Sequence, residues 1–244
     1  MPPNVCDANL AALGIRHAPA TYGSDYLWDY ELGSKNRLDR GRISFDESIF
    51  YIKWYNIEQF VRLPICGQST ILNLGTATSK GFDLDWRAIV ARGLLLNLGV
   101  SYTDATIDKT VTVPGAINPL IDSGDSIGGA MFSPFQLSAA VEYHHSVLNH
   151  EAYVRADYEF HGLGPKPDPR LLGYDPTLPR TPSSGYLAMR MGVDFSNWQL
   201  SIYAKNVLNS HVELQRTRQY FTSLYYGFTY RPRTLGLEAI YRLN

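Results

Sequence analysis

Several features that are common in other classes of protein are scarce in this chain of 244 residues. Charged residues make up 18% of it, below the roughly 25% of an ordinary soluble domain, which excludes a long disordered tail or a coiled coil. The net charge of -1 supplies no excess of cations for a nucleic-acid partner. No purely apolar run is longer than 88–91, whereas a membrane-spanning helix needs roughly 18 apolar residues. The first residues also lack the basic start and apolar segment of a signal peptide.

The chain is rich in aromatic residues, with 17 tyrosines, and its main pattern is alternation of apolar and polar side chains. Alternation places successive side chains on opposite faces of a β-strand. The clearest segment is 151–161, whose apolar face holds Ala152, Val154, Ala156, Tyr158 and Phe160. Similar segments are 94–104, 135–144, 186–195, 198–206 and 234–243. No segment of comparable length has helical spacing, so the sequence predicts a nearly all-β protein.

The connections between these segments alternate in length. Short links occur at 37–41, 91–93, 146–149 and 196–197, whereas long links rich in Gly and Pro occur at 55–71, 106–133, 162–184 and 209–230. Transmembrane β-barrels have this alternation, because their periplasmic turns are short and their extracellular loops are long. The segments also suit the roughly 9–11 residues with which a tilted strand crosses a membrane. The sequence therefore predicts an antiparallel transmembrane barrel whose last strand ends on the periplasmic side.

Counting back from the last strand gives nine strands, which begin with 26–36 and 42–54. Single-chain bacterial barrels have an even number of strands, so an odd count predicts part of a larger barrel. Residues 1–25 are expected to form an extracellular loop. In 42–54, apolar residues occupy both faces and Glu47 interrupts one of them, so we expect either a β-bulge or a partly buried inward face.

Aromatic residues gather near the expected strand ends. In a barrel they would form the belts of tyrosine and tryptophan that lie at the two membrane surfaces. The alternative is that aromatic residues are simply good strand formers. The residues concerned are Trp28, Tyr30, Tyr51, Trp54, Trp86, Tyr102, Tyr143, Trp198 and Tyr241.

Six segments, in their order and spacing, resemble the barrel of TonB-dependent outer-membrane receptors. They are 26–35 (YLWDYELGSK), 50–54 (FYIKW), 73–84 (NLGTATSKGFDL), 102–105 (YTDA), 205–209 (KNVLN) and 231–237 (RPRTLGL). The resemblance covers nearly the whole chain. Two departures from the family pattern are Asp83, where Glu is usual, and the end of the chain, which lacks the terminal aromatic residue of outer-membrane barrels.

The resemblance implies both a fold and a function. Such transporters close at roughly 22 strands around a plug, so residues 1–244 are expected to be the C-terminal barrel portion, a fragment without the plug and the N-terminal strands. The intact receptor would lie in the outer membrane of a Gram-negative bacterium. It would bind a scarce nutrient such as a siderophore and admit it when the TonB system pulls the plug. Its implied partners are outer-membrane lipid, the missing plug and barrel strands, TonB through the plug, and the nutrient, with no cofactor and no nucleic acid.

Cys6 and Cys66 are the only cysteines, and both fall in segments assigned to the extracellular side. An oxidising route through the periplasm permits a disulfide between them. Closing a loop of this size would stabilise the fold by roughly 4 kcal/mol in the chain-entropy model. The alternatives are a free thiol or a bond to a missing part of the protein.

Other clusters of reactive residues have ordinary explanations. His144, His145, His150 and His161 surround one hairpin without the closed ligand set of a zinc site, so we expect no metal site. Glu142, Asp157 and Glu159 share one face, where they alternate with Arg155 and Arg190. That pattern is typical of a hydrated, ion-paired barrel lumen rather than a glycosidase. Common catalytic motifs are absent, so the chain is not expected to be an enzyme and no catalytic residue is assigned.

The last long loop is the best candidate for ligand contact, because it combines arginines with aromatic side chains. Such a surface can hold a siderophore, a polyphenol or a sugar-like molecule by stacking and charge-assisted hydrogen bonds. The alternative is that 225–230 merely extends the hairpin beyond the membrane. The candidate residues are Arg216, Arg218, Tyr220, Phe221, Tyr225 and Tyr226, with Arg62 from another loop facing the same vestibule.

Two other classes of function remain open from the sequence. A soluble β-sandwich or carbohydrate-binding module would bury one face of each strand in a core and fold without detergent. An outer-membrane enzyme is a minor third possibility, which changes at Asp157 and Glu159 would test. Fold alone does not reveal the ligand, since similar barrels carry many cargoes.

Overall fold

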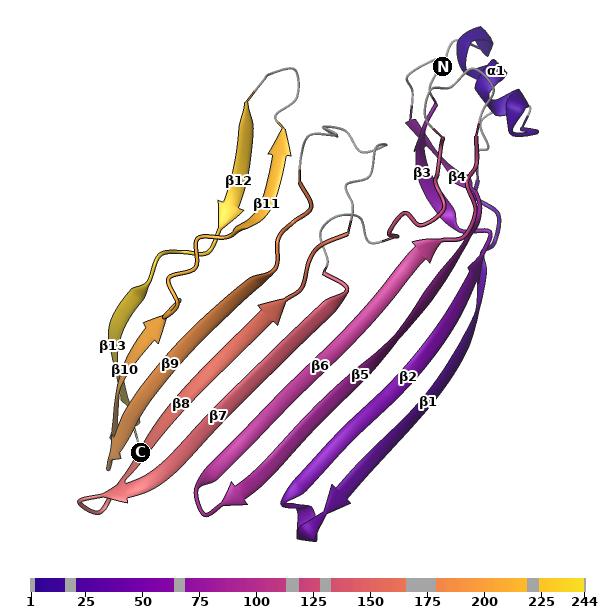
Figure 1. The fold of residues 1–244 in the computed structure, drawn as a ribbon. Helices are drawn as coiled ribbons and strands as arrows, with labels where there is room; N and C mark the ends of the chain where they lie inside the picture. Colours follow the sequence, from indigo (N-terminus) through magenta and orange to yellow (C-terminus); the bar gives the residue numbers. More distant parts are fainter. Residues whose placement is uncertain are drawn as a thin grey trace.

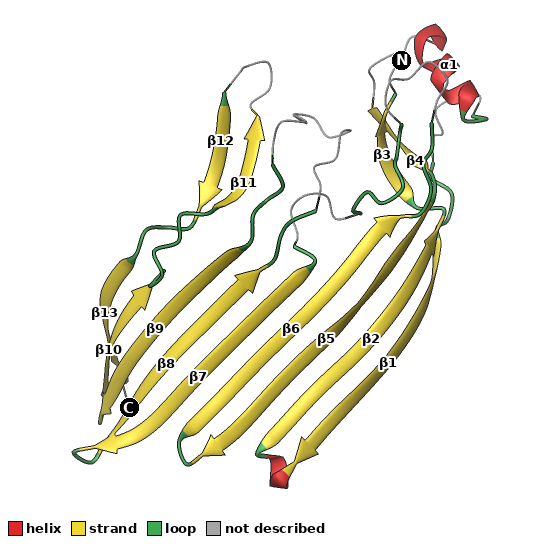
Figure 2. Ribbon diagram, viewed as in Figure 1, coloured by secondary structure: helices red, strands yellow, loops and turns green. Residues whose placement is uncertain are grey.

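The computed structural model describes residues 3–15, 21–63, 69–112, 119–127, 133–165, 179–218 and 224–243. Most of these residues belong to one curved antiparallel sheet of nine strands, in the order β1-β2-β5-β6-β7-β8-β9-β10-β13 (Figures 1 and 2). The strands are β1 (Tyr26–Leu38), β2 (Ile43–Tyr55), β5 (Thr76–Ala91), β6 (Leu94–Ile107), β7 (Phe135–Val147), β8 (His150–His161), β9 (Ser184–Phe195), β10 (Trp198–Lys205) and β13 (Thr234–Tyr241). In the described part of the chain, β1 and β13 form two open edges. The sheet is thus part of an antiparallel barrel, as the alternation predicts.

The connections at the two ends of the sheet differ in length. At the turn end, β1 and β2 are joined through the short helix η1 (Asp39–Gly41), and two-residue turns join β5 to β6, β7 to β8 and β9 to β10. The turn between β5 and β6 requires glycine, because Gly93 has a φ of 77° and a side chain there would overlap the carbonyl oxygen of His144. All the long connections lie at the opposite end, the loop end (Figure 1). The predicted alternation of short and long links is therefore confirmed.

The two faces of the sheet differ in chemistry. Cross-strand pairing places Leu84, Val100, Leu137 and Phe160 in one row. The next row holds Asp85, Gly99, Ser138 and Glu159. Because neighbouring rows point to opposite sides, the sheet has an apolar face and a polar face. The apolar face stays open to its surroundings, and Leu237 on β13 is 82% exposed.

Strand β2 is regular along its whole length. It pairs without a register shift with both β1 and β5, so the β-bulge expected from Glu47 is wrong. The other explanation holds, because Phe50, Ile52 and Trp54 of the polar face are half-buried. In the nine-stranded sheet, a register shift between described residues occurs instead on β5, between Ile89 and Ala91.

Three structured elements lie in segments expected to be loops. They are the helix α1 (Pro3–Ala12), the hairpin of β3 (Glu58–Arg62) and β4 (Ser69–Asn73), and the hairpin of β11 (Glu213–Arg218) and β12 (Tyr225–Thr229). The sequence gives little sign of α1, which has no acidic residue in its first turn and no basic residue in its last. No helix within the described ranges is both long and apolar enough to cross a membrane.

Candidate functional site

The loop end of the sheet carries the candidate site, and its two sides are built differently. The hairpin β11–β12 stands above β10 and β13, whereas α1 and the hairpin β3–β4 stand above β2, β5 and β6 (Figure 1). The hairpin β11–β12 is a separate two-stranded sheet. Residues Tyr225–Thr229, most of the segment for which a simple extension of the hairpin was the alternative, form β12 of this separate sheet, so ligand contact and its alternative both stay predictions.

The register of β11–β12 divides the candidate residues between two faces. Arg216 pairs with Gly227 and Arg218 pairs with Tyr225, so both arginines and Tyr225 occupy positions on one face. Tyr226 lies on the other face with Phe228, and their rings meet edge to face at 6.2 Å. Every residue of β12 is exposed. One face of the hairpin is thus cationic and aromatic, and we call it the Arg216 face.

Arg216, a permanent cation, forms an ion pair with Glu213 on the same strand. The hydrogen bond with Glu213, and then the charge of that carboxylate, raise the pKa of the Arg216 guanidinium above its ordinary value. Its side chain remains 44% exposed. A planar guanidinium has five N–H donors, so the bond to Glu213 leaves donors available for an anionic ligand.

The base of this hairpin is closed by Asn206, which follows β10 directly. Its side-chain Nδ2 donates hydrogen bonds to the carbonyl oxygens of Ser210, at 3.0 Å, and Arg231, at 2.9 Å. Its Oδ1 accepts a hydrogen bond of 2.8 Å from the Ser210 amide. Asn206 is only 1% exposed. Directly before Arg231 in the chain, the ring of Tyr230 packs against that of Tyr186 on β9, with 5.0 Å between the ring centroids.

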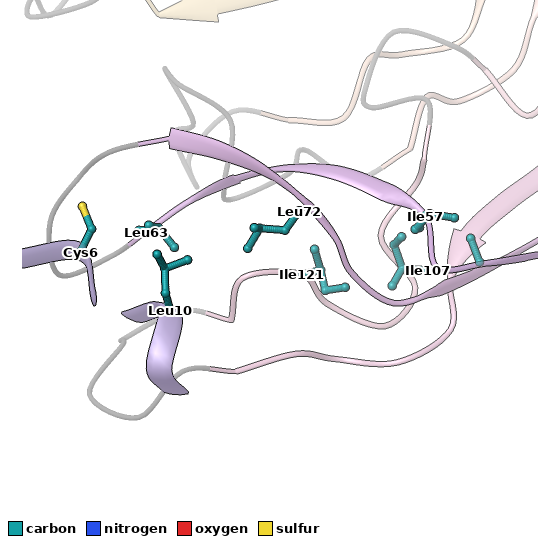
Figure 3. Packing of buried hydrophobic residues seen from close by; sticks show 8 residues of the cluster. Cys6, Leu10, Ile57, Leu63, Leu72, Ile107 and Ile121 are labelled. Carbon is teal, nitrogen blue, oxygen red and sulfur yellow. The ribbon is translucent and has the colours of Figure 1, made fainter. Parts of the chain in front are cut away.

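The opposite side of the loop end has an apolar core, the mouth cluster, seen from close by in Figure 3. Leu10 of α1 packs with Leu63 and Leu72 from the β3–β4 hairpin, and Ile107 and Ile121 complete the cluster. These five side chains are at most 3% exposed. Burying one such aliphatic side chain stabilises a fold by about 1.5–3 kcal/mol. The cluster therefore holds α1, the β3–β4 hairpin and the connection that follows β6 together at the loop end. It also contains Cys6, Ile57 and Ala77.

A polar network fastens the chain where it leaves β6. Lys53 Nζ donates to Asp108 Oδ2 at 2.8 Å and to Thr78 Oγ1 at 3.0 Å, and Thr78 Oγ1 donates to Asp108 Oδ1 at 2.6 Å. Burial acts to raise the pKa of Asp108, but the hydrogen bonds from Lys53 and Thr78 prevail and lower it. Asp108 is therefore held as a carboxylate that joins β2, β5 and the connection after β6.

The polar face of the sheet carries ion pairs over its C-terminal strands. Arg155 bridges Glu142, at 2.7 Å, and Asp157, at 2.6 Å, while Arg190 pairs with Glu238. Asp157 and Glu142 are thus bound by the same arginine, as the prediction of an ion-paired lumen requires. Among the described residues, no group of three His, Cys, Asp or Glu side chains is placed to hold a metal ion.

Over the central strands, the polar face holds carboxylates without such partners. A cavity of about 320 Å³ is lined by Asp83, Asp85 and Glu159 together with Ser138 and His161. In the part of the chain that the structure describes, none of the three carboxylates forms an ion pair. Gly99 forms part of the floor, and the Ser138 hydroxyl and the Asp85 carboxylate occupy the space that a side chain there would fill.

Only part of the predicted ligand-contact set falls within the described residues. Arg216, Tyr225 and Tyr226 are described, and the register separates Tyr226 from the other two. Tyr220, Phe221 and the side chain of Arg218 lie outside the described residues. So does the side chain of Arg62, although its strand β3 stands on the mouth-cluster side of the loop end, away from β11–β12 (Figure 1).

Only one of the two cysteines of the predicted disulfide lies within the described residues. Cys6 is 4% exposed in the mouth cluster, while Cys66 lies outside the described residues, so their bond stays a prediction. Sequence reasoning assigned no role to Asn206, Asp108 or Lys53. For Asn206 a signal was present, because an asparagine directly after a strand often adopts a positive φ and hydrogen-bonds nearby backbone. Its φ is 51°.

One sheet with an apolar face, a polar face, short turns at one end and structured loops at the other defines the class of protein: an outer-membrane type of β-barrel, present here in part. The family described as TonB dependent receptor-like, beta-barrel matches residues 26–207. The chain therefore belongs to this family. The β-sandwich predicted as an alternative is wrong, because the main sheet has no second sheet packed on it among the described residues.

Solved structures share the fold at low sequence identity. The ferric yersiniabactin uptake receptor FyuA from Yersinia pestis matches with a TM-score of 0.64 and 12% identity, over 90% of this chain and 30% of that one. The ferripyoverdine receptor of the outer membrane of Pseudomonas aeruginosa matches with a TM-score of 0.62 and 15% identity, over 89% of this chain and 27% of that one. The FrpB iron transporter from Neisseria meningitidis matches with a TM-score of 0.60 and 13% identity, over 90% of this chain and 32% of that one. This chain spans less than a third of each of these proteins. No curated protein matches its sequence.

Proposed function

We propose that residues 1–244 are the C-terminal barrel portion of a TonB-dependent receptor that imports a ferric siderophore across the outer membrane of a Gram-negative bacterium. The observation that carries the proposal is the open sheet with one apolar and one polar face, topped by the Arg216 face. The structural neighbours named above are receptors for ferric yersiniabactin and ferripyoverdine and an iron transporter, which supports iron as the cargo.

In this proposal the barrel has a passive role. The apolar face contacts outer-membrane lipid, and the polar face lines a hydrated lumen that receives the plug and the remaining strands of the same receptor. TonB acts through the plug, so the residues of this chain bind and guide the ligand and carry no catalytic step or cofactor. The Arg216 face supplies guanidinium donors and aromatic rings, which suit an anionic, aromatic iron chelate.

Transport is tested in cells that lack the gene. We expect uptake of radioactive iron from one of three probes, pyoverdine, yersiniabactin or a catecholate siderophore, to fall to background and to return when the intact gene is restored. If iron uptake from all three probes is unchanged, the siderophore proposal is wrong.

The ligand surface is tested by two tyrosines that are neighbours in sequence. Tyr225 lies on the Arg216 face and Tyr226 on the opposite face, so Tyr225→Ala should weaken binding of the transported probe about tenfold, through lost stacking beside the cations. Tyr226→Ala is the matched control and should change binding little. Equal losses in the two variants would show that the Arg216 face is not the ligand surface. Binding is measured by fluorescence quenching on outer-membrane preparations.

A further inference from the structure

The hairpin β11–β12 is joined to the barrel strands through two connecting segments of the chain. All five residues of β12 are exposed, and the hairpin forms a sheet separate from the barrel strands. Its legs, residues 209–212 and 230–233, connect it to β10 and β13. In the part of the chain that the structure describes, contacts with the barrel strands act on the position of the Arg216 face at the point where these two legs meet the barrel.

Asn206 occupies that point. The chain reverses there with a φ of 51°, and the next residue, Val207, donates its amide to the carbonyl oxygen of Leu187 on β9 at 2.8 Å. The backbone on the barrel side is thus fixed by a neighbouring strand. The Asn206 side chain is the part that reaches towards the hairpin.

The hydrogen bonds of Asn206 join both legs at once. A carboxamide has two N–H donors and one carbonyl acceptor, and all three functions are used. One leg is held through both backbone groups of Ser210 and the other through the carbonyl oxygen of Arg231. Asn206 is only 1% exposed, so water does not compete for these hydrogen bonds. Losing one of its N–H donors would therefore leave a buried carbonyl oxygen unsatisfied.

We propose that Asn206 is the positioning residue of the ligand hairpin: its side chain clasps the two legs of β11–β12 and so sets the orientation of the Arg216 face over the barrel. The inference rests on the proposed function only for the statement that this hairpin binds ligand. The clasp itself is independent of the ligand. The geometry requires donation to two carbonyl oxygens, which aspartate cannot provide at neutral pH.

Asn209 provides a matched control three residues along the chain. It also has a positive φ, 52°, and it also links the legs, since its Oδ1 accepts a hydrogen bond of 3.3 Å from the amide of Arg233. It acts there as an acceptor, a role that a carboxylate keeps. The same substitution should therefore disturb the hairpin at Asn206 and leave it unchanged at Asn209.

The test is amide hydrogen exchange on the complete receptor in detergent, comparing Asn206→Asp, Asn206→Gly and Asn209→Asp with the natural protein. We expect exchange in 213–218 and 224–233 to rise roughly tenfold in both Asn206 variants, with β9, β10 and β13 unchanged. Asn206→Gly keeps the positive φ and adds no charge, so it covers the case in which the aspartate variant does not fold. Asn209→Asp should exchange like the natural protein.

Unchanged exchange in the hairpin of both Asn206 variants would overturn the proposal, and so would an equal rise throughout β9, β10 and β13, because that would indicate a general loss of stability. This readout needs no ligand. Failure of the clasp is therefore distinguishable from failure of the Tyr225→Ala binding test, which decides whether the hairpin is a ligand surface.

Discussion

Gly81 illustrates how single residues determine the spacing of the sheet. It lies in β5 opposite Thr103, and an added methyl group would overlap the backbone carbonyl oxygen of Tyr102. Backbone atoms in a paired strand cannot rotate away, so Gly81→Ala should destabilise the barrel by about 3 kcal/mol. The measurement is urea unfolding in lipid vesicles, followed by tryptophan fluorescence. Gly33→Ala on β1 is the control and should cost less, because its nearest neighbour, the Glu47 carbonyl oxygen, would lie at 3.2 Å.

Asp108 gives the loop end a predictable response to acid. Its pKa is lower in the folded protein than the ordinary 3.8, so the unfolded chain binds a proton more readily than the folded one. The network with Lys53 and Thr78 should therefore contribute its full stability above that ordinary value and lose it as the pH falls through the lower, folded pKa.

Comparing the natural protein with Asp108→Asn checks this response. The natural protein should be more stable by on the order of 1 kcal/mol near neutral pH. The difference should shrink as the pH falls below 3.8 and disappear once the pH has passed the lower, folded pKa of Asp108. A difference that grows on acidification would contradict the assigned direction of the pKa shift.

At the scale of elements, the mouth cluster predicts how α1 is retained. Cys6 is buried in it, and no described cysteine is a free thiol. We expect mass spectrometry of a non-reduced digest to find Cys6 joined to Cys66. Reduction should then expose α1 to limited proteolysis while the barrel strands stay resistant. Two alkylated cysteines in the non-reduced protein would contradict the bond.

The elements also show what sequence patterns can and cannot predict. The alternation in 151–161 and the short link at 196–197 predict β8 and the turn before β10 closely, because period and turn length are local properties. By contrast, α1 is stabilised by Leu63, Leu72 and Ile121, which are distant in sequence. The candidate site shows the same limit. Its arginines and tyrosines are visible in the sequence, but their division between two faces depends on the register of β11–β12.

At the scale of the whole molecule, the chemistry of the two faces of the sheet predicts that an introduced arginine is costly on the apolar face and tolerated on the polar face. Leu137 lies on the apolar face between Val100 and Phe160, and Ser138 lies on the polar face between Gly99 and Glu159. Leu137→Arg should destabilise the receptor in lipid vesicles by about 2–4 kcal/mol, because it places a charge in hydrocarbon. Ser138→Arg should be tolerated, since it meets Asp85 and Glu159 at the acidic cavity. Similar costs for both variants in urea unfolding would contradict the assignment of the faces.

The order of strands in the sheet has a consequence for how the molecule is made. Each strand of the main sheet pairs with the one that precedes or follows it there, and the two intervening hairpins stay outside the sheet. No strand has to be threaded between two that are already joined. The sheet can therefore grow from one edge by successive hairpins, because each new strand pairs with the strand of the sheet that comes before it in the chain, through either a short turn or a long loop. It presents the same kind of unpaired edge at every stage until further strands arrive.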